Sequence, residues 1–190
     1  PIGGSVRKSL LPELLDSALE WGACEIILEN WDPHSSADNE ILEKLADHTS
    51  LGLHCLTLNV LGDGPTEETF NTIQYWVKKF PKASLSDHFC WIGTHENYLG
   101  VFIPPSDPVH ILREKIRKAQ ERLQKPIMLE NIAISAGDST YIDRYHSQLV
   151  EACSLEGVEV LLDIENLRLD SISSGRPYKE LLSYYDQSII

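Results

Sequence analysis

The stretch Ile127-Met128-Leu129-Glu130-Asn131 is a short apolar run that ends abruptly in a carboxylate and an amide. Short apolar runs bounded by polar residues are typical of buried β-strands. The chain repeats this design at residues 24–30, 51–54, 83–88 and 158–163. Together, these predicted strands end at Glu29, His54, His88, Glu130 and Asp163. All of these are residue types that bind metal ions, so we expect function at the strand ends.

A helical pattern lies between consecutive predicted strands. Repeated strand-helix units of this kind form parallel strands joined by right-handed crossovers. An open doubly wound sheet and a (β/α)8 barrel both fit, and the lack of a glycine-rich phosphate loop favours the α/β barrel of the TIM type. A complete barrel has eight strands and typically about 250 residues. We therefore expect residues 1–190 to be a single barrel domain, incomplete at its C-terminal end after about five to six units.

The helices are predicted from apolar residues at helical spacing. They cover residues 8–21, residues around 41–45, and residues 70–80, 108–123 and 141–153, and a last helix begins at Pro177. Asp107 is expected to cap the helix that begins at Pro108. Histidines in loops and on helices are expected at the surface; they are His34, His48, His110 and His146.

Two further segments have less regular patterns. Residues 90–107 are expected to form a long loop, in which Trp91, His95, Asn97 and Tyr98 line or cover a pocket. An ordinary surface excursion is the alternative for this loop. The final Ser188-Ile189-Ile190 is predicted to begin a sixth strand.

Composition excludes some classes of function. The formal net charge of −13 repels nucleic-acid phosphates and anionic membrane surfaces, which argues against a nucleic-acid or membrane-surface role. No apolar run approaches the roughly 20 residues that a membrane span needs. The four cysteines form no Cys-x-x-Cys pair and are interpreted as buried, reduced thiols of a cytoplasmic protein; they are Cys24, Cys55, Cys90 and Cys153.

The strand ends together suggest a metal site. Because active sites of such barrels lie at the carboxyl ends of the strands, His54, His88, Glu130 and Asp163 are expected around one mouth. Two imidazoles and two carboxylates suit iron, manganese or catalytic zinc. Nearby amides would hold a ligand, a metal-bound water or substrate; they are Asn30, Asn131 and Asn166. The alternative is that each side chain only makes hydrogen bonds within its own loop.

Several of these blocks resemble one family as a set. They are Leu53-His54, residues 85–91 (LSDHFCW), residues 127–131 (IMLEN), residues 161–167 (LLDIENL) and Glu29-Asn30-Trp31. In this order and spacing they are similar to the multinuclear non-haem iron-dependent oxidative enzymes of the methanobactin-biosynthesis and 3-thiaglutamate-biosynthesis type.

The resemblance implies a barrel with two or three iron ions that uses dioxygen to oxidise cysteine residues of a ribosomally made peptide, with a peptide-recognition partner protein delivering the peptide. It implies that His54, His88, Glu130 and Asp163 bind iron, with manganese or zinc as alternatives. The catalytic residues would be Glu130, Asn131 and Asn166, and Glu29 and Asn30 would help to bind the cofactor.

The chain also departs from that family. Asp87 stands where the family usually has Glu, and the family's remaining ligands lie on strands beyond residue 190. A fragment, a second chain or a degenerate member would each explain this. Two other functions stay open: a metal-dependent sugar isomerase or phosphoesterase on a similar barrel, and a non-catalytic binding subunit. Lys125, which precedes its strand, lies at the wrong end for an isomerase lysine.

Overall fold

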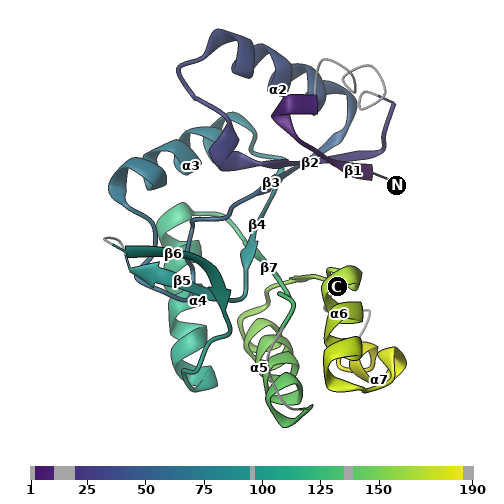
Figure 1. Cartoon of the computed structure of the whole chain (residues 1–190). Helices are drawn as coiled ribbons and strands as arrows, with labels where there is room; N and C mark the ends of the chain where they lie inside the picture. The colour runs from purple at the N-terminus through teal and green to yellow at the C-terminus, as the bar shows by residue number, and fades with distance from the viewer. Residues whose placement is uncertain (1–2, 11–19, 95–96, 135–138, 186–190) are drawn as a thin grey trace. The chain divides into compact units, whose positions relative to one another are not determined.

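The computed structural model describes residues 3–10, 20–94, 97–134 and 139–185 (Figure 1). The chain forms two compact units. The first comprises Pro1–Leu58 and Pro65–Ser86, and the second comprises Asn59–Gly64 and Asp87–Ile190. The prediction of one barrel domain for the whole chain stays a prediction.

The first unit is built on parallel strands in the order β1, β2, β3 and β4. Their bounds are Gly3–Val6, Ala23–Ile27, Ser50–His54 and Ser84–His88, and β4 begins in this unit and ends in the second. Short 3-10 helices follow β1 and β2, at Lys8–Leu10 and Leu28–Asn30. The register pairs His54 with Ile27 on one side and with Ser86 on the other. His54 therefore stands at the carboxyl end of its strand, as predicted.

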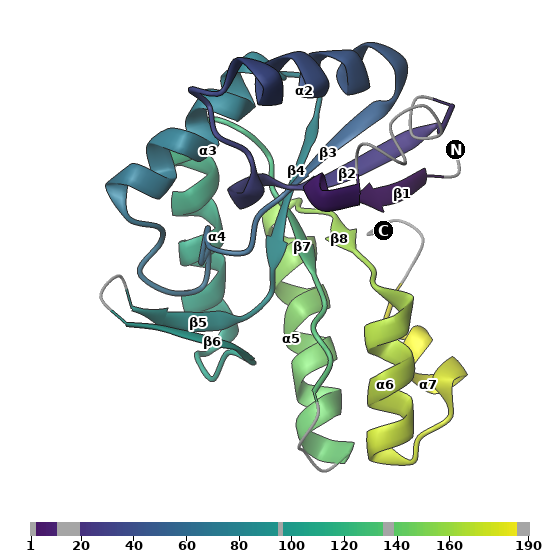
Figure 2. The same ribbon diagram turned by 45° about the horizontal axis from the view of Figure 1, so that its top comes forward.

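Helices α2 (Ser36–His48) and α3 (Glu67–Lys79) cover these strands, and they lie next to one another (Figure 2). Each begins after a hydroxyl cap, because the side chains of Ser35 and Thr66 accept hydrogen bonds from backbone N–H groups of the first turn. Tyr75 of α3 donates to Asn39 of α2 at 2.8 Å, which joins the two helices. Their apolar faces are buried; they include Leu42, Leu45, Phe70, Ile73 and Trp76.

In the second unit the end of β4 is followed by parallel strands β7 (Met128–Glu130) and β8 (Val160–Leu161). The backbone N–H of Phe89 donates to the carbonyl of Glu130 at 2.8 Å. The parallel sheet of the described residues thus has six strands in the order β1-β2-β3-β4-β7-β8. These strands lie side by side in chain order, without the reversal of strand order that defines a doubly wound sheet, and the predicted α/β barrel class is confirmed.

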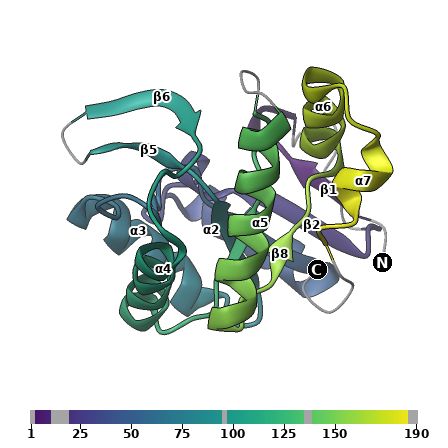
Figure 3. The ribbon, with the colours of Figure 1, turned by 90° about the horizontal axis from the view of Figure 1, so that it is seen from below.

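The described part of the second unit also contains helices α4 (Val109–Leu123), α5 (Ser139–Glu156), α6 (Ile164–Ser174) and α7 (Tyr178–Leu182). Figure 3 shows α4 beside α5, and Arg113 of α4 donates to Glu156 of α5 at 2.8 Å. Among the described residues, each helix is too short or too polar to cross a bilayer.

Several sequence predictions need correction. Residues 90–107 are not a long loop, because β5 (Trp91–Thr94) and β6 (Asn97–Ile103) pair as an antiparallel hairpin. Asp107 does not cap α4, since its carboxylate accepts a hydrogen bond from Lys115 and the helix begins after Pro108. Strand β8 ends at Leu161 because Asp163 already caps α6, a helix that was not predicted.

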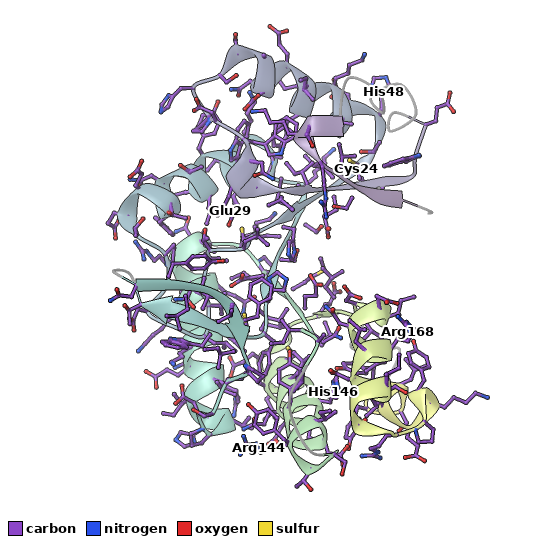
Figure 4. The ribbon with its side chains drawn as sticks, in the orientation of Figure 1. Cys24, Glu29, His48, Arg144, His146 and Arg168 are labelled. Carbon is purple, nitrogen blue, oxygen red and sulfur yellow. The ribbon has the colours of Figure 1, made fainter. Side chains whose placement is uncertain are left out.

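His146 is also not at the surface. It is fully buried on α5 (Figure 4), with Nε2 lying 3.1 Å from Oδ2 of Asp170 on α6 and Nδ1 hydrogen-bonded to the hydroxyl of Tyr185 at 2.5 Å. Most of the helix predicted at residues 8–21, the histidine at position 95 and the strand predicted at residues 188–190 lie outside the described residues.

Candidate metal-binding strand ends

The carboxyl ends of β4 and β7 bring two predicted metal ligands together. His88 is the last residue of β4 and Glu130 the last residue of β7. The Nε2 atom of His88 lies 3.9 Å from the Oε2 atom of Glu130, and both side chains are largely buried. Metal–nitrogen and metal–oxygen bonds of about 2.0–2.2 Å span such a distance, so one cation can contact both atoms. An imidazole with a carboxylate suits iron, manganese or zinc.

The surroundings of His88 are apolar on one side and acidic on the other. The ring of Phe102 from β6 stacks on the His88 ring, with centroids 4.2 Å apart and an interplanar angle of 28°. Burial and the nearby carboxylates of Asp87 and Glu130 raise the pKa of the Cys90 thiol, so this cysteine stays protonated. The Asp87 carboxylate accepts a hydrogen bond from the backbone N–H of Val60 at 3.0 Å, which fixes the segment before α3 in this unit.

Asp163 and the two asparagines form a hydrogen-bonded junction between β7 and α6. Buried Asn131 accepts from the backbone N–H of Asp163 at 2.7 Å and donates to its carbonyl at 3.0 Å. Asn166 donates to the carbonyl of Asn131 at 2.9 Å. Oδ1 of Asp163 accepts from the N–H groups of Glu165 and Asn166 and so caps α6. Among the described residues, the Asp163 carboxylate is not in the group of ligand atoms that includes His88 and Glu130.

In the first unit, His54 is held by a neighbouring strand. Its Nδ1 atom lies 2.9 Å from the hydroxyl of Ser86, and the side chain is buried. Burial lowers the pKa of His54 to about 4, which keeps the imidazole neutral at physiological pH. Neutral imidazole is the form that binds metal ions, and a hydrogen bond to one ring nitrogen orients the ring for coordination through the other.

Glu29 fastens the segment that follows His54. Its Oε1 atom accepts hydrogen bonds from the backbone N–H groups of Leu56 and Thr57 and from the Thr57 hydroxyl, at 2.7–2.8 Å. Its Oε2 atom is buried and has no hydrogen-bond partner among the described residues. A buried carboxylate oxygen without a donor is costly unless a cation or another donor reaches it, so Glu29 fits a role beside a bound cation. Figure 4 labels its position.

Asn30 lies apart from these hydrogen bonds. It lines a cavity of about 570 Å³ in the first unit. The cavity also contains two basic residues, Arg7 and Lys8, together with Ser9 and Ile27. Asn30 is therefore placed to contact a small anionic or polar molecule.

This chain is similar in sequence to one protein family and to several bacterial proteins. A family model described as "RiPP precursor modification enzyme MbnB/TglH/ChrH" matches residues 1–190. A "UPF0276 protein" of Caulobacter vibrioides is 24% identical over 162 residues, covering 83% of this chain and 58% of the relative. The corresponding protein of Alcanivorax borkumensis is 21% identical over 191 residues, covering 92% of this chain and 62% of the relative.

A solved structure shares the fold. The D-psicose 3-epimerase of Clostridium cellulolyticum H10, crystallised with D-tagatose, matches with a TM-score of 0.51 and 12% identity, over 94% of this chain and 66% of that one. At this identity the likeness shows the fold alone, and it agrees with part of a TIM-type barrel. The chain spans about 58–62% of the length of the relatives named above.

Proposed function

The chain belongs to the RiPP precursor modification enzyme family MbnB/TglH/ChrH, and from this premise we propose that it takes part in the metal-dependent oxidation of cysteine residues in a ribosomally made peptide. The observation that carries the proposal is the 3.9 Å pair of His88 and Glu130 at the ends of neighbouring strands. We propose two or three iron ions as the cofactor.

Bound iron would supply the redox chemistry with dioxygen and a binding position for the cysteine thiolate. His88 and Glu130 would hold one ion through an imidazole nitrogen and a carboxylate oxygen. His54, kept neutral by burial, is proposed as a further ligand on the basis of its strand-end position and the family resemblance. Asp163 is proposed as another ligand, and its cap hydrogen bonds would fix the side chain.

The remaining site residues would hold the proposed metal ligands in position rather than bind the metal themselves. Asn131 ties the end of β7 to the start of α6 through the backbone of Asp163. Asn166 supports Asn131 from the first turn of α6. Glu29 would hold the loop after His54 and place its second carboxylate oxygen toward a positive charge. These contacts would fix the ligands before substrate binds, which is how supporting residues raise metal affinity.

We propose a peptide as the substrate and a peptide-recognition protein as the partner. The excess of acidic over basic side chains, 29 against 16, favours a basic leader segment or a basic partner by charge complementarity. The same charge opposes a nucleic-acid partner. The epimerase likeness gives no reason to propose sugar chemistry, because it rests on the fold.

The test is oxidation of a synthetic peptide that contains a single cysteine. The chain is loaded anaerobically with ferrous iron, mixed with the peptide and exposed to dioxygen, and the peptide mass is followed by mass spectrometry. We expect a mass change confined to cysteine in the wild type and its loss in Glu130→Gln. Exposed Glu121→Gln on α4 is the matched control and keeps the activity. An unchanged peptide in the presence of bound iron would contradict the proposal.

A further inference from the structure

Strand β6 carries an exposed apolar surface. Its sequence, Asn97–Ile103 (NYLGVFI), contains no charged residue. The exposed fractions of its large apolar side chains are high: Tyr98 55%, Leu99 48%, Val101 54% and Phe102 40%. Single exposed apolar residues are ordinary, but a contiguous group on one strand marks a binding surface.

The outer edge of β6 is available for pairing. Within the described residues, β5 and β6 form a separate two-stranded sheet. The other edge of β5 is held by Asn59, which donates to the carbonyl of Gly93 at 3.0 Å and accepts from the N–H of Ile92. Soluble proteins usually protect an edge strand with lysine, proline or an inward charge, and β6 has none of these. An extended peptide can add to such an edge through main-chain hydrogen bonds.

The same strand contacts the candidate metal site. Phe102 stacks on the imidazole of His88 at 4.2 Å between centroids. A peptide lying along β6 would therefore pass close to His88, which is proposed above as a metal ligand. A second copy of this chain is a poorer occupant, since two molecules of charge −13 repel one another.

We propose that β6 docks an extended, uncharged segment of the peptide substrate by strand addition and so carries a cysteine of that peptide toward His88. This rests on the proposed function for the identity of the ligand as a peptide, but the docking itself needs no metal. Main-chain hydrogen bonds would supply most of the affinity, and the side chains of Leu99 and Val101 would select apolar residues in the peptide.

The test uses a fluorescein-labelled synthetic peptide of about ten residues, with one cysteine between alternating valine and threonine, and fluorescence anisotropy on the chelator-treated chain. We expect binding to the wild type and at least about tenfold weaker binding to Leu99→Lys and to Val101→Lys. Ile172→Lys, on α6 and 65% exposed, is the matched control and is expected to bind within about twofold of the wild type. A second peptide with proline at alternate positions, which cannot donate those hydrogen bonds, should bind about tenfold more weakly.

The outcomes separate this proposal from the proposed function. Equal binding by the lysine variants, equal binding of the proline peptide, or no binding to the wild type overturns docking on β6. A change in the sedimentation mass of Leu99→Lys without loss of peptide binding also overturns it, because the edge would then pair two copies of the chain. Peptide docking by a chain that takes up no iron would leave docking intact and remove the oxidase. Normal oxidation of the peptide by Leu99→Lys would leave the proposed oxidase function intact and overturn docking on β6.

Discussion

The Nε2 atom of His88 lies 3.9 Å from the Oε2 atom of Glu130, each side chain at the last position of its strand. Two parallel strands that are neighbours in the sheet thus bring an imidazole and a carboxylate within reach of one cation. If this pair binds metal, Glu130→Gln removes the charge and weakens binding while keeping the size of the side chain. We expect at least about a tenfold loss of metal affinity, measured by competition with a chelator. Unchanged affinity in Glu130→Gln would exclude this carboxylate as a ligand.

The junction of Asn131 with Asp163 should contribute to stability. Asn131→Ala leaves the part-buried N–H and carbonyl of Asp163 without their side-chain partner. We expect a loss of about 2 kcal/mol in the free energy of unfolding, measured in urea. Asn166→Ala removes a single hydrogen bond and should cost about 1 kcal/mol. Equal stability of Asn131→Ala and the wild type would mean that solvent replaces the amide.

The buried pair of His146 and Asp170 gives a second prediction on stability. Both side chains are fully buried and 3.1 Å apart, and Asp170 also accepts from the N–H of Ile134. Removing one member of such a pair leaves its partner without compensation, so we expect Asp170→Ala to lose about 3 kcal/mol in urea unfolding. Asp143→Ala on α5 removes a partly exposed partner of Arg176 and should lose less than about 1 kcal/mol. Similar losses in both variants would contradict this ranking.

The Asp38 carboxylate should make the free energy of unfolding depend on pH. Burial acts to raise its pKa, but hydrogen bonds from Lys8 and from the N–H of Asp32, with the Lys8 charge, outweigh burial and lower the pKa below 3.8. The folded chain therefore favours the carboxylate, so its stabilising effect is present above pH 3.8 and is lost as the pH falls through the folded value. We expect the unfolding free energy of Asp38→Asn to fall less steeply in that acid range. The measurement is urea unfolding as a function of pH, and parallel slopes for both proteins would contradict it.

The ends of three strands were predictable because an apolar run and a polar stop are both local in the sequence. His54, His88 and Glu130 each end their strand in the structure as the sequence predicts. Strand β1 was missed because glycines replace its apolar residues: a side chain at Gly3 would meet the carbonyl of Ala23 at 2.3 Å. Close packing between strands, rather than hydrophobicity, selects the residue there.

Two other features depend on contacts that the local pattern does not contain. Helix α6 exposes Ile164, Leu169 and Ile172, so its apolar residues do not mark one buried face and the helix was not predicted. His146 was expected at the surface because it lies on a helix, and its partners Asp170 and Tyr185 are far along the chain. The metal ligands themselves stay predictions, since residue type and strand position indicate a donor but not the ion it holds.

The most direct test of the central claim is metal analysis of the chain purified without oxygen. Inductively coupled plasma mass spectrometry should find iron at about one equivalent or more per chain, and Glu130→Gln should lower that content while exposed Glu121→Gln does not. Zinc or manganese at full occupancy with no iron would contradict the oxidative mechanism.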